Sequence, residues 1–253
     1  MEIIIVKCLI DNYSYIIFND KTLEAAVIDP SDANPVIREI EKNNLKLKYI
    51  FNTHHHYDHV GGNSKLKEKY KCKVVGFEKD KDRIPEIDIE LKDNQKWKNE
   101  LFECDILHVP GHTSGHITIY IKDIKALFTG DTLFSLGCGR IFEGTYDEMF
   151  NSLKKLKNYP KNTKIYCGHE YTKNNSDFCL SIETRNQKLV KKIEEIKKKI
   201  NKNIPTIPST LGEEIECNVF LRTDNIEIQK HLGINSGDPL KTFAKLRDLK
   251  DNF

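Results

Sequence analysis

The feature that most restricts the fold of this chain is an alternation of short apolar runs with turn-forming residues over roughly the first 170 positions. The runs are rich in β-branched and aromatic residues, as in EIIIV, SYIIF, KVVGF and HITIYI, and this composition is typical of strands. Between them lie stretches with apolar residues at helical spacing, such as NPVIREIEKNNL, SKLKEKY and YDEMFNSLKKLKNYP. Strands interspersed with helices predict an α/β fold.

Several of these strand-like runs end directly in a polar loop that contains Gly or His. The four clearest loops are THHHYDH, PGHTSGH, TGDT and CGHE. Sites are commonly built from loops at sheet ends, because a rigid scaffold positions side chains that remain accessible there. We therefore expect these four loops to form one site.

The sequence changes character from about Thr172 onward. The segment IETRNQKLVKKIEEIKKKINKN has apolar residues at helical spacing over its whole length, and the helix-breaking segment IPTIPST follows it. The last residues, DPLKTFAKLRDLKDNF, predict another helix. We therefore expect an α/β domain at 1–172 and a helical domain at 173–253.

Charge and cysteine content narrow the partners and the setting. The 253 residues include 40 Lys and Arg against 38 Asp and Glu, which gives a net charge of +2 and predicts neither a nucleic-acid nor a membrane partner. No apolar run approaches the roughly 20 residues that cross a bilayer. The seven cysteines are scattered and form no C-x-x-C pair, which is typical of a reducing, cytoplasmic setting. The same spacing excludes a thiolate zinc ribbon, so any metal must be held by imidazole and carboxylate.

Four of the nine histidines fall within six residues, at His54, His55, His56 and His59. Residues two apart in an extended stretch project to the same side, so His54 and His56 can reach one cation while His55 points away. Asp58 and His59 follow once the chain turns, and they are placed to serve a second ion. One loop therefore already offers as many ligands as a single tetrahedral site needs.

Three further ligand candidates come directly after apolar runs and beside a glycine: His112, Asp131 and His169. Asp131 is the best candidate for a bridge, because a carboxylate can hold two cations whereas a neutral imidazole offers one lone pair. The predicted first metal is held by His54, His56 and His112. The predicted second metal is held by Asp58, His59 and His169, with Asp131 shared between the two.

The segment THHHYDHVGG resembles the signature of the metallo-β-lactamase superfamily, and the whole pattern is similar to the glyoxalase II family. The similarity extends through LIDNYSYII, AAVIDP, PGHTSGH, FTGDTLFSLGCGRIFEGT, YCGHEYT, PSTLGEE and KLRDLKDNF. This resemblance implies an αββα metallo-β-lactamase sandwich with a dinuclear site at one edge. It makes 1–172 the catalytic domain and 173–253 a helical domain for glutathione recognition.

The resemblance also implies which residues contact glutathione: Arg140, Phe142, Tyr171, Arg247 and Lys250. Two of these depart from the family pattern, which has Lys at the first position and Tyr at the second. Arg140 keeps a cation and adds a fork suited to carboxylates, whereas Phe142 has no hydroxyl and leaves only its backbone to contribute. Tyr57 replaces the usual Trp of the metal loop, which should alter packing more than chemistry.

The implied activity is hydrolysis of S-(2-hydroxyacyl)glutathione, typified by S-D-lactoylglutathione, as the second step of methylglyoxal detoxification. Water bridging two cations would supply hydroxide at neutral pH, with Asp131 holding both ions and Asp58 also orienting the nucleophile. We expect a monomer that takes a small-molecule glutathione thioester. Two divalent ions are expected, Zn²⁺ first, with Fe and Mn²⁺ as alternatives because availability often decides among such metals.

Three other functions fit parts of the same pattern. A glutathione persulfide dioxygenase of this superfamily keeps the H-x-H-x-D-H loop but uses a single iron. A β-lactamase would have no use for the helical tail or for a cationic glutathione pocket. A non-catalytic metal-binding protein is the alternative from another class, and the complete ligand set argues against it.

Overall fold

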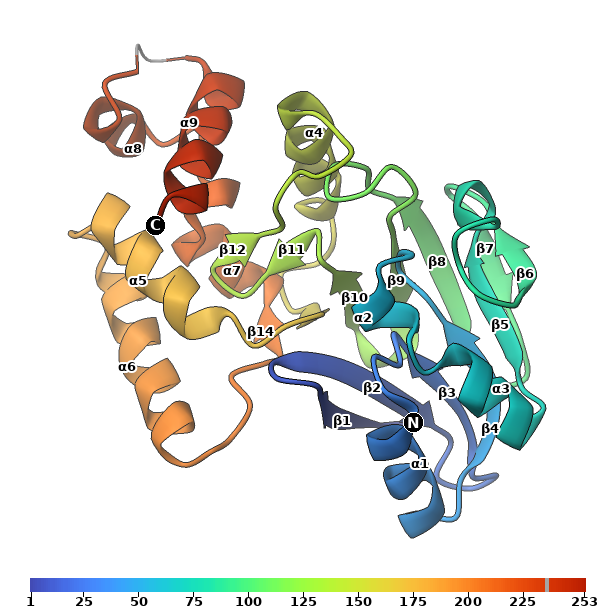
Figure 1. The fold of residues 1–253 in the computed structure, drawn as a ribbon. Coiled ribbons are helices and arrows are strands. Elements are labelled where there is room, and N and C mark those ends of the chain that lie inside the picture. Colours follow the sequence, from blue (N-terminus) through green and yellow to red (C-terminus); the bar gives the residue numbers. More distant parts are fainter. Residues whose placement is uncertain (235–236) are drawn as a thin grey trace. The chain divides into compact units, whose positions relative to one another are not determined.

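A computed structural model describes residues 1–234 and 237–253 of the chain (Figure 1). These residues form two compact units. The first comprises residues 1–108 and 114–130, and the second comprises residues 109–113 and 131–253. Mixed sheets with helices confirm the predicted α/β class.

The first unit contains a six-stranded sheet in the order β1-β2-β3-β4-β5-β6. Its first three strands pair antiparallel, and each later strand lies parallel to the one before it. Most of these strands coincide with apolar runs in the sequence. Their bounds are Glu2–Cys8 (β1), Asn12–Phe18 (β2), Glu24–Ile28 (β3), Lys46–Phe51 (β4), Lys73–Phe77 (β5) and Ile87–Leu91 (β6).

A second set of strands in this unit pairs antiparallel from β7 to β10. Their bounds are Lys96–Lys98 (β7), Glu103–His108 (β8), Ile117–Ile121 (β9) and Ala126–Gly130 (β10). Aromatic rings join the two sheets: the centroids of Tyr15 and Phe128 are 5.4 Å apart, and those of Phe51 and Phe102 are 5.7 Å apart. The first unit is therefore a sandwich with an aromatic layer between its sheets.

Helices α1 (Ala33–Lys42) and α3 (Asn63–Tyr70) contribute to a core on the first sheet. Helix α1 begins at Asp32, whose side chain accepts a hydrogen bond from the Asn34 N–H. It buries Val36 and Ile40, one turn apart, against that sheet. The short helix α2 (Tyr57–Val60) lies between them in the sequence and carries two of the predicted metal ligands.

Among the described residues, the second unit contains most of the helices, with α4 yellow-green and α5 to α9 running from yellow-orange to red in Figure 1. Its strands are β11 (Leu133–Phe134), β12 (Gly137–Cys138), β13 (Lys164–Cys167) and β14 (Ser209–Thr210). Its helices are α4 (Tyr146–Leu156), α5 (Thr172–Ile182), α6 (Gln187–Asn201), α7 (Leu211–Cys217), α8 (Ile226–His231) and α9 (Pro239–Asp251). Phe178, Phe220 and Phe243 are fully buried and pack on one another, which joins α5 to α9.

The long helical pattern predicted from residue 182 to residue 203 is divided in the structure. Its first residue ends α5, and α6 begins only at Gln187. Asn186 caps α6 by accepting hydrogen bonds from the N–H groups of Lys188 and Leu189. Glu183 directly follows α5 and pairs with Arg222, so its side chain is engaged with another element. The predicted terminal helix is confirmed as α9.

Among residues 1–234 and 237–253, no helix combines the length and the apolar character needed to cross a bilayer.

Candidate metal centre

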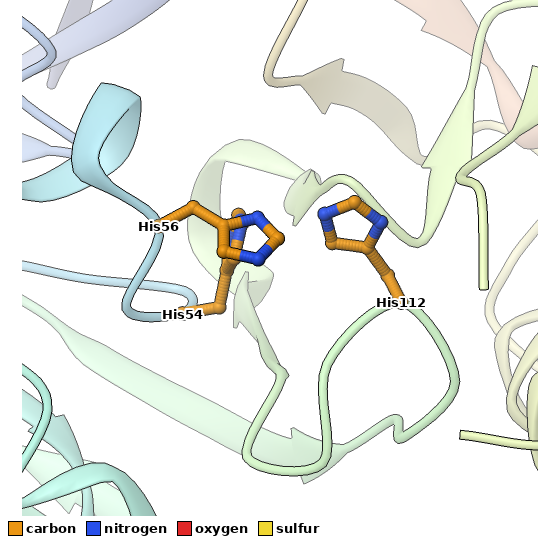
Figure 2. A group of neighbouring side chains, drawn as sticks. All are labelled: His54, His56 and His112. Atoms are coloured by element: carbon orange, nitrogen blue, oxygen red, sulfur yellow. The ribbon is translucent and has the colours of Figure 1, made fainter. Parts of the chain in front are cut away.

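In the first unit, the chain leaves β4 at Phe51 and passes through the histidine-rich loop before α2. Nε2 of His54 lies 3.1 Å from Nδ1 of His56, and Figure 2 shows these two imidazoles extending from the same loop. Two nitrogens bound at 2.0–2.1 Å to one tetrahedral ion would be about 3.3 Å apart. The spacing therefore fits two ligands of one metal. The third side chain labelled in Figure 2, His112, belongs to the second unit.

The imidazole of His54 is fully buried and held on its other side by Thr53. The Thr53 hydroxyl donates to Oδ2 of Asp29 at 2.6 Å, so its oxygen accepts from Nδ1 of His54 at 3.1 Å. Nε2 of His54 is then left with the lone pair that a metal requires. The ring of His116 stacks on that of His54 with centroids 4.6 Å apart, which further restrains it.

His59 is held by the same buried carboxylate. Nδ1 of His59 lies 3.0 Å from Oδ2 of Asp29, so the proton sits on Nδ1 and the lone pair on Nε2. Nε2 in turn lies 3.8 Å from Oδ2 of Asp58. Asn12 donates to that carboxylate at 3.0 Å and also to the Asp58 carbonyl. The two predicted ligands of the second metal that lie in this unit, Asp58 and His59, are therefore both held by neighbouring side chains.

A second group of possible ligand atoms lies within 4.8 Å and comprises Asp29, His54 and His59. By distance alone, Asp29 could therefore also be a metal ligand. Both oxygens of Asp29 already accept hydrogen bonds, Oδ1 from the Thr53 N–H and Oδ2 from the Thr53 hydroxyl. A carboxylate engaged in this way, and also facing His59, is suited to orient ligands rather than to bind the ion.

His55 lies apart from these ligands, as the extended spacing predicts. Its Nδ1 is 3.3 Å from Oδ2 of the buried Asp80, which also pairs with Arg83. This side chain therefore serves the structure of the loop. Tyr57, where the family has Trp, is 79% exposed, so the replacement changes little of the core packing.

In the second unit, Asp131 brings two of the predicted ligands together. Its Oδ2 lies 3.5 Å from Nε2 of His112 and 3.3 Å from Nε2 of His169. All three side chains are buried. One carboxylate oxygen facing two imidazole nitrogens at ligand-to-ligand spacing fits a bridge, although the two histidines face the same oxygen rather than one each.

The two histidines of this unit are oriented differently. Nδ1 of His112 lies 2.7 Å from the carbonyl oxygen of Arg140, which can only accept, so Nδ1 carries the proton and Nε2 the lone pair. The ring of His169 stacks face to face on that of Tyr171, with centroids 4.6 Å apart. Both imidazoles are therefore fixed with Nε2 toward Asp131.

Four of the five residues assigned to glutathione have exposed or partly exposed side chains. Arg140 and Phe142 are 62% and 63% exposed, and the Phe142 N–H donates to the His112 carbonyl. Tyr171 is also exposed. Lys250 is half-buried, hydrogen-bonded to Asn174 and placed over the rings of Phe178 and Phe253, and this burial lowers the pKa of its ammonium.

Arg247 differs from the other four because its side chain is only 3% exposed. Its Nη1 donates to the carbonyls of Cys138 at 2.8 Å and Gly139 at 3.4 Å, and its Nη2 donates to Asp251 at 2.9 Å. Its guanidinium also lies over the ring of Phe220. The hydrogen bonds of Arg247 are therefore made to the chain itself.

Sequence reasoning missed Asp29 and Asn12, which orient candidate ligands, and Asp80, which holds the neighbouring His55. Asp29 follows an apolar strand in AAVIDP, which is the same signal that identified Asp131. Asn12 and Asp80 carry no comparable signal, because their partners are 46 and 25 residues away in the sequence.

The cysteine side chains are all buried. Burial raises the pKa of the thiols, to about 12 for Cys167 and Cys179. Such thiols do not form the thiolate that a nucleophile or a soft metal ligand needs near neutral pH. This agrees with a site made of imidazole and carboxylate.

Comparison with known proteins gives the family. Residues 10–169 match the model of the metallo-beta-lactamase superfamily, and a solved B3 metallo-beta-lactamase, BLEG-1, has the same fold with a TM-score of 0.69 at 21% identity. That comparison covers 87% of this chain and 99% of the other. The chain therefore belongs to the metallo-β-lactamase superfamily, and the predicted fold class is confirmed. With this membership, the His and Asp clusters support binding of divalent metal.

Two further comparisons identify the branch of the superfamily. Residues 170–253 match the model described as hydroxyacylglutathione hydrolase C-terminus. A hydroxyacylglutathione hydrolase of Pelagibacter ubique is 57% identical over 253 residues, covering 100% of both chains. That of Methylococcus capsulatus is 42% identical and covers 100% of this chain and 99% of its own. This chain belongs to the hydroxyacylglutathione hydrolase family, as the glyoxalase II resemblance indicated.

Proposed function

We propose that this protein hydrolyses S-(2-hydroxyacyl)glutathione, typified by S-D-lactoylglutathione, to a 2-hydroxy acid and glutathione. The observation that carries this proposal is the similarity to relatives named hydroxyacylglutathione hydrolase over the full length of the chain. The reaction would be the second step of methylglyoxal detoxification. The persulfide dioxygenase and non-catalytic alternatives have no observation that favours them.

The proposed centre holds two divalent ions, with Zn²⁺ the first expectation and Fe or Mn²⁺ the alternatives. His54, His56 and His112 would hold one ion and Asp58, His59 and His169 the other, with Asp131 shared. The donor atoms support this proposal, because four of the imidazoles place a nitrogen next to another candidate ligand at 3.1–3.5 Å. Imidazole and carboxylate are also the ligands expected for these metals.

The bound ions would supply a lowered pKa for water and polarisation of the thioester carbonyl. The chain itself positions the reacting groups. Asn12 fixes the carboxylate of Asp58, which we propose also orients the attacking water. Asp131 fixes the spacing of the ligands around it. The departing thiol has a pKa near ~8.5, so it can leave without a dedicated general acid.

Recognition of glutathione is proposed for the second unit and for the predicted domain at 173–253. Arg140 and Lys250 would pair with the carboxylates of the ligand, and Tyr171 would donate its hydroxyl. Phe142 can offer only its ring and backbone. Arg247 is assigned to the same pocket by the resemblance, and its internal hydrogen bonds favour a contribution through the segment that carries Arg140.

The remaining expectations stay proposals. We propose a monomer that has neither nucleic acid nor membrane as a partner, in keeping with the net charge of +2. We propose a cytoplasmic location, which the buried cysteine thiols support because they suit a reducing compartment.

The function is tested with the protein as purified, before and after treatment with a chelator. We expect hydrolysis of S-D-lactoylglutathione, loss of that activity on metal removal and recovery with added Zn²⁺. Oxygen consumption with glutathione persulfide is measured in parallel, and we expect none. Oxygen uptake without thioester hydrolysis would contradict the proposal and favour the dioxygenase. Metal binding with neither activity would favour the non-catalytic alternative.

A further inference from the structure

The proposed metal ligand His112 is held by the segment 139–144. The carbonyl of Arg140 accepts from Nδ1 of His112 at 2.7 Å, and the N–H of Phe142 donates back to the His112 carbonyl at 3.2 Å. The N–H of Gly144 donates to the carbonyl of Gly111 at 3.1 Å. Backbone groups of this segment therefore fix the orientation of the His112 imidazole and the position of the His112 backbone.

The same segment passes close to Asp131. Gly139 donates through its N–H to the carbonyl of Thr132, and a Cβ at Gly139 would lie 1.9 Å from the Asp131 carbonyl oxygen and 3.2 Å from Nδ1 of His112. No side chain fits at that position. Residues 139–144 thus lie against two of the proposed ligands, so a shift of this segment would move both.

Arg247 anchors this segment from α9. Its guanidinium is buried, and its Nη1 donates to the carbonyls of Cys138 and Gly139, which immediately precede Arg140. Asp251 and the ring of Phe220 hold the guanidinium in place. A buried cation engaged in this way acts on backbone position, because its Nη1 donates to two carbonyls of the chain.

The hairpin that leads into the segment is anchored independently from α7. The side chain of Glu214, fully buried, accepts from the Leu136 N–H at 2.7 Å, and Asn218 donates to the Gly137 carbonyl at 3.0 Å. Leu136 and Gly137 of the β11–β12 hairpin are therefore held by Glu214 and Asn218, whereas Cys138, its last residue, and Gly139 are held by Arg247 from α9. Removing Arg247 would release chiefly the part that supports His112.

We infer that Arg247 is a positioning residue for the metal ligand His112, acting through the backbone of Cys138, Gly139 and Arg140. This inference rests on the proposed ligation by His112. It differs from a direct contact with glutathione, because it couples the terminal helix to the affinity of the metal site. Loss of a group that orients a metal ligand typically lowers metal affinity or activity by about 10- to 100-fold.

The test compares Arg247→Ala, Arg247→Lys and His112→Ala with the exposed neighbour variant Lys245→Ala as control. Zn²⁺ affinity is measured by competition with a chromophoric chelator, and kcat and KM are measured with S-D-lactoylglutathione. We expect about 10- to 100-fold weaker Zn²⁺ binding and a lower kcat for Arg247→Ala, and a smaller loss for Arg247→Lys. Lys245→Ala should equal the wild type.

Wild-type Zn²⁺ affinity with only a raised KM in Arg247→Ala would overturn the inference and favour a substrate contact. If Arg247→Ala does not fold, judged by circular dichroism, Arg247→Lys carries the test, and wild-type Zn²⁺ affinity there would equally overturn it. His112→Ala separates this result from the proposed function. Unchanged Zn²⁺ affinity in that variant would remove His112 from the ligand set, and the inference with it.

Discussion

The two units supply their candidate ligands in different ways. In the first unit, His54, His56, Asp58 and His59 lie within six residues, and buried or partly buried side chains such as Asp29 orient them. In the second unit, the ligands are spread over 58 residues, from His112 to His169, and the best-defined support is the backbone carbonyl of Arg140. The first set of candidate ligands is local in the sequence and is held by a few side chains, chiefly Asp29 and Asn12, whereas the second depends on how distant segments pack.

This difference indicates which substitutions would disturb the candidate ligands of each unit. A carboxylate that orients a ligand can be removed by a single substitution. A backbone carbonyl cannot be removed by a substitution. The support of the candidate ligands in the second unit is therefore sensitive to substitution of the residues that fix the backbone, such as Gly139 and Arg247.

The largest effect is expected at Asp131, where the ligands of the second unit meet. Asp131→Ala removes the oxygen that faces both His112 and His169. We expect loss of bound metal and a fall in thioester turnover on the order of 10³-fold, because metal contributes several kcal/mol to such reactions. Elemental analysis and turnover are measured on the same samples, with the exposed Asp123→Ala as control. Full metal occupancy with unchanged turnover would rule out the bridging role.

A smaller effect is expected at Asp29, which orients ligands of the first unit. Asp29→Asn replaces one carboxylate oxygen with an NH₂ donor. The remaining oxygen cannot accept all the hydrogen bonds that Thr53 and His59 now donate to Asp29. We expect metal affinity to fall by about 10- to 100-fold, with chelator competition as the measurement. The exposed Asp20→Asn serves as the matched control. Wild-type affinity would show that the imidazoles of this unit do not depend on Asp29.

The candidate site residues of the first unit could be predicted from the sequence more completely than those of the second unit. The His54–His56 spacing and the separate direction of His55 follow from strand geometry alone, and the structure agrees with both. His112, Asp131 and His169 were found because each follows an apolar run beside a glycine. What holds them could not be found, because Arg140 acts through its carbonyl, which is the same in every residue.

The burial of Arg247 likewise could not be predicted from the sequence. A cation at helical spacing near the chain end is usually solvated, and nothing local indicates that it reaches carbonyls more than 100 residues away. The break between α5 and α6 was missed for a related reason. Asn186 acts there as a cap, in a stretch whose apolar spacing continues the helical pattern.

A modest effect is expected at Arg140, where the side chain and the backbone have separate roles. Arg140→Ala removes an exposed cation but keeps the carbonyl that supports His112. We expect KM for S-D-lactoylglutathione to rise by roughly fivefold, since an exposed charge pair contributes at most about 1 kcal/mol. Metal affinity should stay at the wild-type value, and Lys161→Ala is the exposed control. A large loss of metal would mean that the side chain also supports the centre.

The smallest effect is expected from modification of the cysteines, which occur in both units. Burial raises the pKa of these thiols, to about 11 for Cys72 and about 12 for Cys104, Cys167, Cys179 and Cys217, so little thiolate forms at pH 8. Iodoacetamide should leave the native protein unlabelled and active, and it should label all seven sites after denaturation. Rapid native labelling with loss of turnover would instead indicate a reactive thiol in the site.

The central proposal is that candidate ligands of both units serve one two-metal centre, which hydrolyses a glutathione thioester. The most direct measurement is titration of the metal-free protein with Zn²⁺ while S-D-lactoylglutathione turnover is followed. We predict that turnover rises until two equivalents per chain are bound and then stays constant. Full turnover at one equivalent, or none at any amount of Zn²⁺, Fe or Mn²⁺, would contradict it.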